Sequence, residues 1–209
     1  MRASGILMPV FSLPSRYGIG SFSKSAYQFV DMLKKAGQKY WQILPLCPTS
    51  YGDSPYQSFS TYAGNPYFID LDQLIEEKLL TRKECQACDF GDDPQDIDYG
   101  KLYENRFKLL RKAYERANVG EDQEFEAYRR ENAWWLDDYA LFMAVKDRFD
   151  GVAWNEWAED IRLRWSNAMD YYRRELYYEI EFYSYLQFVF MKQWKKLKNY
   201  ANINGIEII

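Results

Sequence analysis

The sequence of 209 residues contains no histidine. Without an imidazole, the chain cannot build a Ser-His-Asp triad, a Cys-His pair or a histidine-ligated metal site. If it belongs to an enzyme, carboxylates are the simplest source of its acid-base groups. An excess of basic residues is missing too, because the net charge is −4 and the pI is about 5.1. This charge predicts no nucleic-acid partner and no attraction to an anionic membrane.

Cysteine is scarce, with only Cys47, Cys85 and Cys88 in the chain. The last two have the CxxC spacing, but a zinc site needs four ligands and no second pair exists. A redox CxxC should begin a helix after a strand, whereas this one lies within a predicted helical turn, Arg82–Cys88. An odd cysteine count without a signal sequence predicts a reducing cytoplasm. Long apolar runs are also missing, since none approaches the ~18–20 residues that span a bilayer.

Aromatic residues are abundant at 19%, and four of the 19 tyrosines lie in the loop-like stretch between residues 44 and 70. Four prolines stiffen this stretch by fixing φ, at Pro45, Pro48, Pro55 and Pro66. A long loop that is both rigid and aromatic is typical of a binding surface. Tyrosine rings and nearby polar side chains complement the C–H faces and hydroxyl rim of a sugar. The alternative is a proline-rich connection whose tyrosines pack against their neighbours.

The first 46 residues predict a βαβ unit. Ser4–Phe11 and Tyr40–Leu46 are apolar runs typical of buried strands, and Ser23–Ala36 has the periodicity of an amphipathic helix. The strands should be parallel and joined by a right-handed crossover. The loops 12–22 and 47–69 then leave the carboxyl ends of the two strands, where ligand sites occur in such sheets.

From Asp70 to about Ser166 the pattern is helical. Thr81 and Glu84 form a capping box, Tyr99–Ala117 is one helix, and Asn132 is expected to cap another over Ala133–Val145. About 160 residues separate the second strand from the next, whereas a crossover needs only a dozen, so the extra residues should form an inserted helical subdomain.

A single long helix is predicted over Asn167–Asn202. It is followed by a third strand from Ile206 to Ile209, and the chain stops inside that strand. Over Ile180–Met191 the helix is apolar on nearly every side, which is typical of a helix in the interior of a large domain.

Several motifs can be matched to a family. They are Ser4-Gly-Ile-Leu-Met-Pro-Val-Phe-Ser-Leu-Pro-Ser15, Tyr17-Gly-Ile-Gly20, Pro45-Leu-Cys-Pro-Thr49, Tyr51-Gly-Asp-Ser-Pro-Tyr-Gln-Ser-Phe-Ser60, Gly64-Asn-Pro-Tyr67 and Glu179-Ile-Glu-Phe-Tyr183. Together they resemble the 4-α-glucanotransferases, also called amylomaltases or disproportionating enzymes, of glycoside hydrolase family 77. The resemblance implies an α/β fold: the first strands of a (β/α)8 TIM barrel with a large inserted helical subdomain, truncated within the third strand.

The same resemblance implies three sections and a reaction. Residues 1–70 would be the first βαβ unit with glucan-binding loops, 71–166 the inserted helices, and 167–209 the long helix with the start of the third strand. The family transfers α-1,4-glucan segments between maltooligosaccharides or other α-1,4-glucans, in starch and maltose metabolism. One carboxylate attacks the anomeric carbon while a second carboxyl group protonates the leaving oxygen, and the product retains its configuration. No metal or organic cofactor is implied.

The resemblance also assigns substrate-binding residues. Tyr56 matches the tyrosine that lines the sugar subsite beside the scissile bond, and Tyr51 an aromatic position of a further glucan groove. Asp53, Ser54 and Gln57 match or neighbour polar positions of the same loop. Alternatively, Asp53 caps the turn and Gln57 orders the loop.

No catalytic residue is assigned, because the family's catalytic carboxylates lie on later strands. Asp138, Glu156 and Asp160 are possible substitutes, but each lies on a predicted solvated helix face without an identifiable partner. We therefore expect the chain alone to be an inactive portion of the enzyme. The alternative is a non-catalytic glucan-binding or helical interaction module.

Overall fold

The computed structural model describes residues 2–49, 53–93 and 95–209. Three short strands form one parallel sheet in the order β1-β2-β3. They are β1 (Gly5–Leu7), β2 (Tyr40–Gln42) and β3 (Glu207–Ile208). In the register of the first pair, Ile6 lies opposite Trp41, and in the second pair Trp41 lies opposite Ile208. The predicted parallel βαβ unit is confirmed.

The first strand differs from its prediction in length and burial. It ends at Leu7, and its side chains are exposed, with Leu7 53% accessible, so a buried strand over Ser4–Phe11 was wrong. Proline at position 9 has no N–H to donate to a neighbouring strand. From Val10 the chain instead turns into a 3-10 helix, η1 (Val10–Ser12).

Helix α1 (Lys24–Lys35) is the crossover between β1 and β2, and it covers the sheet through one apolar face. Phe29 of this face meets Trp41 edge to face, with ring centroids 5.0 Å apart. Trp41 is fully buried, and its indole N–H donates to the carbonyl of Met8 at 2.8 Å. The sheet therefore fixes the start of the loop that follows β1.

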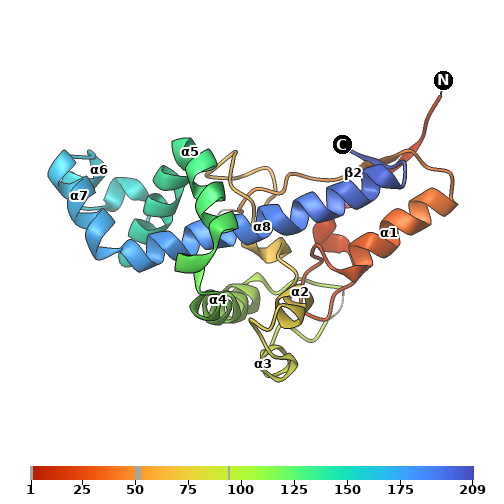
Figure 1. Cartoon of the computed structure of the whole chain (residues 1–209), viewed down its shortest axis with the longest axis horizontal. Helices are drawn as coiled ribbons and strands as arrows, with labels where there is room; N and C mark the ends of the chain where they lie inside the picture. The colour runs from red at the N-terminus through yellow and green to blue at the C-terminus, as the bar shows by residue number, and fades with distance from the viewer. Residues whose placement is uncertain (1, 50–52, 94) are drawn as a thin grey trace. The chain divides into compact units, whose positions relative to one another are not determined.

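The chain divides into two compact units, residues 1–117 with 189–209, and residues 118–188. The sequence placed its section boundaries elsewhere, after residues 70 and 166. In the first unit the end of α8 (Tyr177–Ile203) lies beside α1 (Figure 1), where the Tyr200 hydroxyl donates to Asp31 at 2.7 Å. Between β2 and β3 the regular elements of the described residues are all helices, and no helix there is long and apolar enough to cross a membrane.

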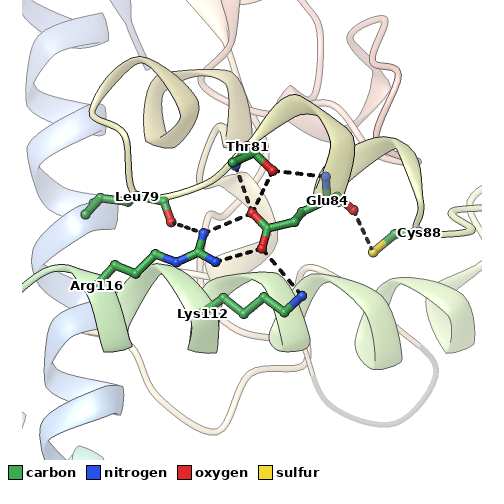
Figure 2. A network of polar contacts seen from close by, with 6 residues as sticks. All are labelled: Leu79, Thr81, Glu84, Cys88, Lys112 and Arg116. Atoms are coloured by element: carbon green, nitrogen blue, oxygen red, sulfur yellow. Dashed lines mark hydrogen bonds and ion pairs between the residues drawn. The ribbon is translucent and has the colours of Figure 1, made fainter.

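Three helices between the strands belong to the first unit, namely α2 (Leu71–Glu76), α3 (Arg82–Gln86) and α4 (Tyr99–Arg116). The predicted capping box at Thr81 and Glu84 is confirmed. Figure 2 shows Arg116 and Lys112 reaching from α4 to the Glu84 carboxylate, with Arg116 Nη2 at 2.7 Å. The hydrogen bonds from Arg116 and Thr81 hold the Glu84 pKa well below its usual range.

The second unit shows two corrections to the predicted helices. Helix α5 (Gln123–Arg148) runs without a break, and its cap is Asp122, which accepts from the Phe125 N–H at 3.1 Å. Asn132 is not a cap. Within α5 its amide donates to the carbonyl of Tyr128 at 2.8 Å and its oxygen accepts from the Trp135 indole at 3.1 Å. These two bonds satisfy a polar side chain that otherwise favours a helix end.

The second correction concerns the long helix predicted over Asn167–Asn202, which is two helices. They are α7 (Ser166–Glu175) and α8, separated at Leu176, where φ is −104° and ψ is 21°. Neither glycine nor proline marks this break in the sequence. The short elements before it are η4 (Trp154–Glu156) and α6 (Glu159–Arg162). Ala168 and Met169 of α7 pack in a core cluster with Trp157 and Ile161.

Candidate functional site

Two loops leave the carboxyl edge of the parallel sheet, 8–22 after β1 and 43–65 after β2. The second contains the predicted site, and we call its residues 53–65 the tyrosine loop. Tyr51, one of the predicted substrate-binding residues, lies outside the described residues. The end of the loop is tied to its beginning, because the Asn65 N–H donates to the Leu46 carbonyl at 2.8 Å. Asn65 then caps η2 (Pro66–Phe68) by accepting from the Tyr67 N–H.

The predicted residues Asp53 to Gln57 form one turn. Asp53 has a φ of 53°, a left-handed conformation that Asp tolerates better than most residues. The Gln57 N–H donates to the Ser54 carbonyl at 3.0 Å, and the Tyr56 N–H to the Ser54 hydroxyl at 3.4 Å. These bonds leave the Tyr56 ring 74% exposed. The turn thus presents an aromatic face to solvent while polar neighbours hold its backbone.

Asp53 lies near two partly buried phenols of the same unit. Burial raises the pKa of both Tyr67 and Tyr99, and the charge of Asp53 raises each further. The two rings are 6.2 Å apart between centroids. Burial also raises the pKa of Asp53 itself, partly offset by a hydrogen bond from Thr49. A carboxylate beside two phenols supplies both acceptors and donors for hydroxyl groups.

Tyr99 also lines a hollow of about 880 Å³ at the surface of the first unit. Its walls come from residues between 11 and 20, in the loop after β1, and between 90 and 99. Polar and apolar groups alternate along it, including Arg16, Asp93 and Phe90. Its volume lies within the range of about 300–1,000 Å³ typical of small-molecule sites. The loop after β1 and the tyrosine loop therefore approach a common region through Tyr99.

A buried arginine that was not predicted from the sequence binds the loop after β1 and the segment that follows the tyrosine loop. Arg106 of α4 is fully buried, and its guanidinium donates to the carbonyls of Tyr17 and Ile69, at 3.3 and 2.5 Å. Burial lowers its pKa to about 10, which leaves it charged at neutral pH. The signal in the sequence was its position among the apolar residues of α4, four residues after Leu102 and four before Leu110.

A second anchor joins α8 to Asp70, which follows the tyrosine loop and η2. The Asp70 N–H donates to the Gln193 side-chain oxygen at 2.7 Å, and the Gln193 amide donates back to the Asp70 carbonyl at 3.2 Å. The Asp70 carboxylate caps α2 by accepting from the Gln73 N–H. The Arg106 and Gln193 hydrogen bonds are both buried in the first unit. The segment after the tyrosine loop is therefore fixed, while Tyr56 within the loop is exposed.

The three carboxylates named as possible catalytic substitutes make surface contacts or are exposed. Asp138 accepts from Arg164 at 2.8 Å in an exposed ion pair, Asp160 accepts from the Ile161 N–H, and Glu156 is exposed. Burial raises the pKa of Cys85 to about 11, which is opposite to the shift of a reactive thiol. Within the described ranges, no three His, Cys, Asp or Glu side chains are grouped so as to hold a metal ion.

The tyrosine loop follows a parallel strand at its carboxyl edge, where α/β proteins place ligand sites. Comparison with known proteins identifies the family. Residues 8–209 match the glycoside hydrolase 77 family, described as 4-alpha-glucanotransferase. The curated 4-alpha-glucanotransferase of Clostridium butyricum is 51% identical over 202 residues, which are 97% of this chain and 42% of that protein. That of Thermus thermophilus is 43% identical over 212 residues, covering 100% and 41%.

Solved structures give the same result. The amylomaltase from Streptococcus agalactiae in complex with acarbose superposes with a TM-score of 0.94 at 43% identity, over 100% of this chain and 42% of that one. The amylomaltase from Corynebacterium glutamicum is 19% identical with a TM-score of 0.73, which supports the fold alone. The chain belongs to the 4-alpha-glucanotransferase family, as an amino-terminal portion that spans about 42% of the length of its relatives.

Proposed function

We propose that this chain is the glucan-positioning portion of a 4-α-glucanotransferase, and that it is inactive alone. The observation that supports the proposal is the Tyr56 ring, 74% exposed on a turn held by Ser54. The ring stacks on a glucose unit beside the bond to be broken, since an aromatic face matches the C–H face of a pyranose. Asp53 and Gln57 offer hydrogen-bonding groups to its hydroxyls, and Tyr51 contacts the glucan in a further groove.

In this proposal, β1 to β3 are the first strands of a (β/α)8 barrel, and residues 71–166 are inserted between the second and third. The parallel order of the sheet supports it, because TIM-barrel strands are parallel and neighbours in sequence order. Ligand sites in such barrels lie at the carboxyl ends of the strands, where the tyrosine loop begins.

The reaction we propose for the whole enzyme is a retaining transfer between α-1,4-glucans. It needs two carboxyl groups about 5–5.5 Å apart, one as nucleophile and one as acid and then base. We assign neither to this chain, in which Asp138 is paired with Arg164 and Glu156 is exposed. The chain holds the donor sugar in register, and its fixed loop ends reduce the ordering that binding would cost.

The experiment is a calorimetric titration of the purified chain with maltoheptaose, with cellohexaose as the β-linked control. We expect binding of the α-linked sugar only, and no glucose released from maltotriose. Glucose release would refute the assignment of catalysis to residues outside the chain. A chain that binds neither sugar would refute the glucan site and favour a helical interaction module.

A further inference from the structure

The second unit has a hollow of its own, of about 420 Å³, at the end of α5. The six residues that line it are Arg148, Phe149, Asp150, Ala158, Tyr171 and Tyr172. They come from the last turn of α5, the turn after it, the segment before α6, and α7. All six belong to residues 118–188, so the hollow is formed within one unit.

Aromatic rings form one wall of this hollow and are held rigidly from behind. Phe149 stacks on buried Trp157, with ring centroids 5.9 Å apart and an interplanar angle of 16°. Tyr172 packs against Phe149 at 6.3 Å and against Tyr171 at 5.2 Å. Tyr171 is the outermost ring of the group and is 51% exposed. A ring with a fixed orientation and a free face binds a flat apolar ligand surface with little loss of rotamer entropy.

Two charged side chains of opposite sign also line the hollow. In the described part of the chain, neither the Arg148 guanidinium nor the Asp150 carboxylate makes a hydrogen bond or an ion pair, and the Tyr171 hydroxyl makes no hydrogen bond. Asp150 is held in the left-handed region, with φ at 52°, by the turn that ends α5. The guanidinium, carboxylate and phenol are therefore available as donors and acceptors beside an aromatic face.

The two charges of the hollow cancel, so its net charge favours neither an anion nor a cation. The carboxylate of Asp150 opposes binding of an anion, and the carbonyl groups at the end of α5 add a negative partial charge. Arg148 opposes a cation in the same way. A ligand with apolar C–H faces and many hydroxyls satisfies the ring, the donors and the acceptors together, whereas an apolar peptide leaves both charges without a partner.

We propose that the hollow formed by Arg148, Asp150 and Tyr171 is an additional glucan-binding site, here called the second site, which holds an α-1,4-linked segment remote in sequence from the tyrosine loop and from Tyr51. The inference rests on the proposed function, since it takes the same class of ligand. One sugar ring stacks on Tyr171, Arg148 donates to its hydroxyls and Asp150 accepts from them. The site retains a long glucan while another segment of it occupies the tyrosine loop, which raises the effective concentration of the polymer there.

The test is calorimetric titration of the whole 209-residue chain with maltohexaose. Removing the tyrosine-loop ring with Tyr56→Ala should leave residual binding. In that background, Tyr171→Ala should weaken the residual binding at least about tenfold, as expected for an aromatic contact at the centre of a site. Arg148→Gln removes an exposed charge without touching the core and should weaken it about threefold or more. The control is Tyr178→Ala, which removes a more exposed ring (74% against 51%) of the same unit outside the hollow, and it should change nothing.

The outcomes separate this inference from the proposed function. If Tyr56→Ala abolishes all maltohexaose binding, the second site is refuted and the tyrosine loop stands. If Tyr56→Ala has no effect while Tyr171→Ala and Arg148→Gln weaken binding, the second site stands and the proposed tyrosine-loop site fails. Residual binding that is insensitive to Arg148→Gln refutes the second site, whether or not Tyr171→Ala folds. Equal binding of cellohexaose also refutes it, because the site would then not select the α linkage.

Discussion

Replacing Arg106 with methionine should destabilise the first unit and loosen both loops of the candidate site. Methionine has a similar length and no charge, so the change removes the hydrogen bonds and keeps most of the packing. The guanidinium donates to the carbonyls of Tyr17, in the loop after β1, and of Ile69, just after η2 and the tyrosine loop. Both carbonyls would then be buried without a donor.

The expected loss in the free energy of unfolding follows from the two charge-assisted hydrogen bonds that Arg106→Met removes. Each contributes about 1.5–3 kcal/mol, which gives a loss of about 3–6 kcal/mol before compensation. The variant no longer dehydrates a guanidinium, a cost that is visible in the pKa lowered to about 10. We therefore expect a net loss of about 3 kcal/mol in the free energy of unfolding, at the low end of this range.

Urea unfolding followed by far-UV circular dichroism measures this loss. Lys108→Met is the matched control, since Lys108 is an exposed cation of the same helix, and it should stay within about 0.5 kcal/mol of the wild type. Arg106→Lys keeps the charge but cannot bridge two carbonyls, so its loss of unfolding free energy should lie between those of Lys108→Met and Arg106→Met. A loss below about 1 kcal/mol for Arg106→Met would refute the role of the buried arginine as an anchor.

Three other perturbations follow from particular contacts. Thr81→Ala removes the cap of α3, which accepts from the Glu84 N–H, and should cost about 1 kcal/mol by urea unfolding; no change would mean that the cap is not needed. Gly64→Ala places a Cβ against the Phe190 ring and should cost about 1–3 kcal/mol in the same assay, whereas a neutral result would contradict the packing. Stability should also fall above about pH 10, because burial raises the pKa of Tyr67 and of Tyr17, Tyr128 and Tyr139, and the folded chain holds these protons longer than the unfolded chain. The lowered pKa of Arg106 has the opposite effect on stability, but it is a single group against four tyrosines. A urea-unfolding midpoint that rises between about pH 8 and pH 11 would therefore contradict the expected loss of stability.

Local signals in the sequence predicted the elements that are fixed locally. The period of Ala26, Phe29, Val30 and Leu33 gave α1 within one residue at each end, and the Thr81 capping box gave the start of α3. The break at Leu176 could not be predicted, because the residues around it are ordinary helix formers. At the interruption, Leu176 packs against the core cluster that contains Met169 and Trp157.

The candidate site also has one part that the sequence predicted and one part that it did not. The tyrosine loop was visible in the sequence because proline and tyrosine mark a rigid, aromatic segment. Asp53, Ser54, Tyr56 and Gln57 lie together in one turn, while their contacts with a sugar remain a prediction. Arg106 was not predicted, since its partners are backbone carbonyls 37 and 89 residues away, which leave no pattern in the sequence.

The affinity for maltoheptaose of the wild-type chain, compared with Tyr56→Phe and Tyr56→Ala, tests the central claim most directly. The claim is that the exposed Tyr56 ring is a glucan-stacking surface. Tyr56→Phe keeps the ring and should bind within about threefold of the wild type, while Tyr56→Ala should weaken the tyrosine-loop component of binding at least about tenfold, or 1.4 kcal/mol. Equal affinity in all three chains would contradict the claim.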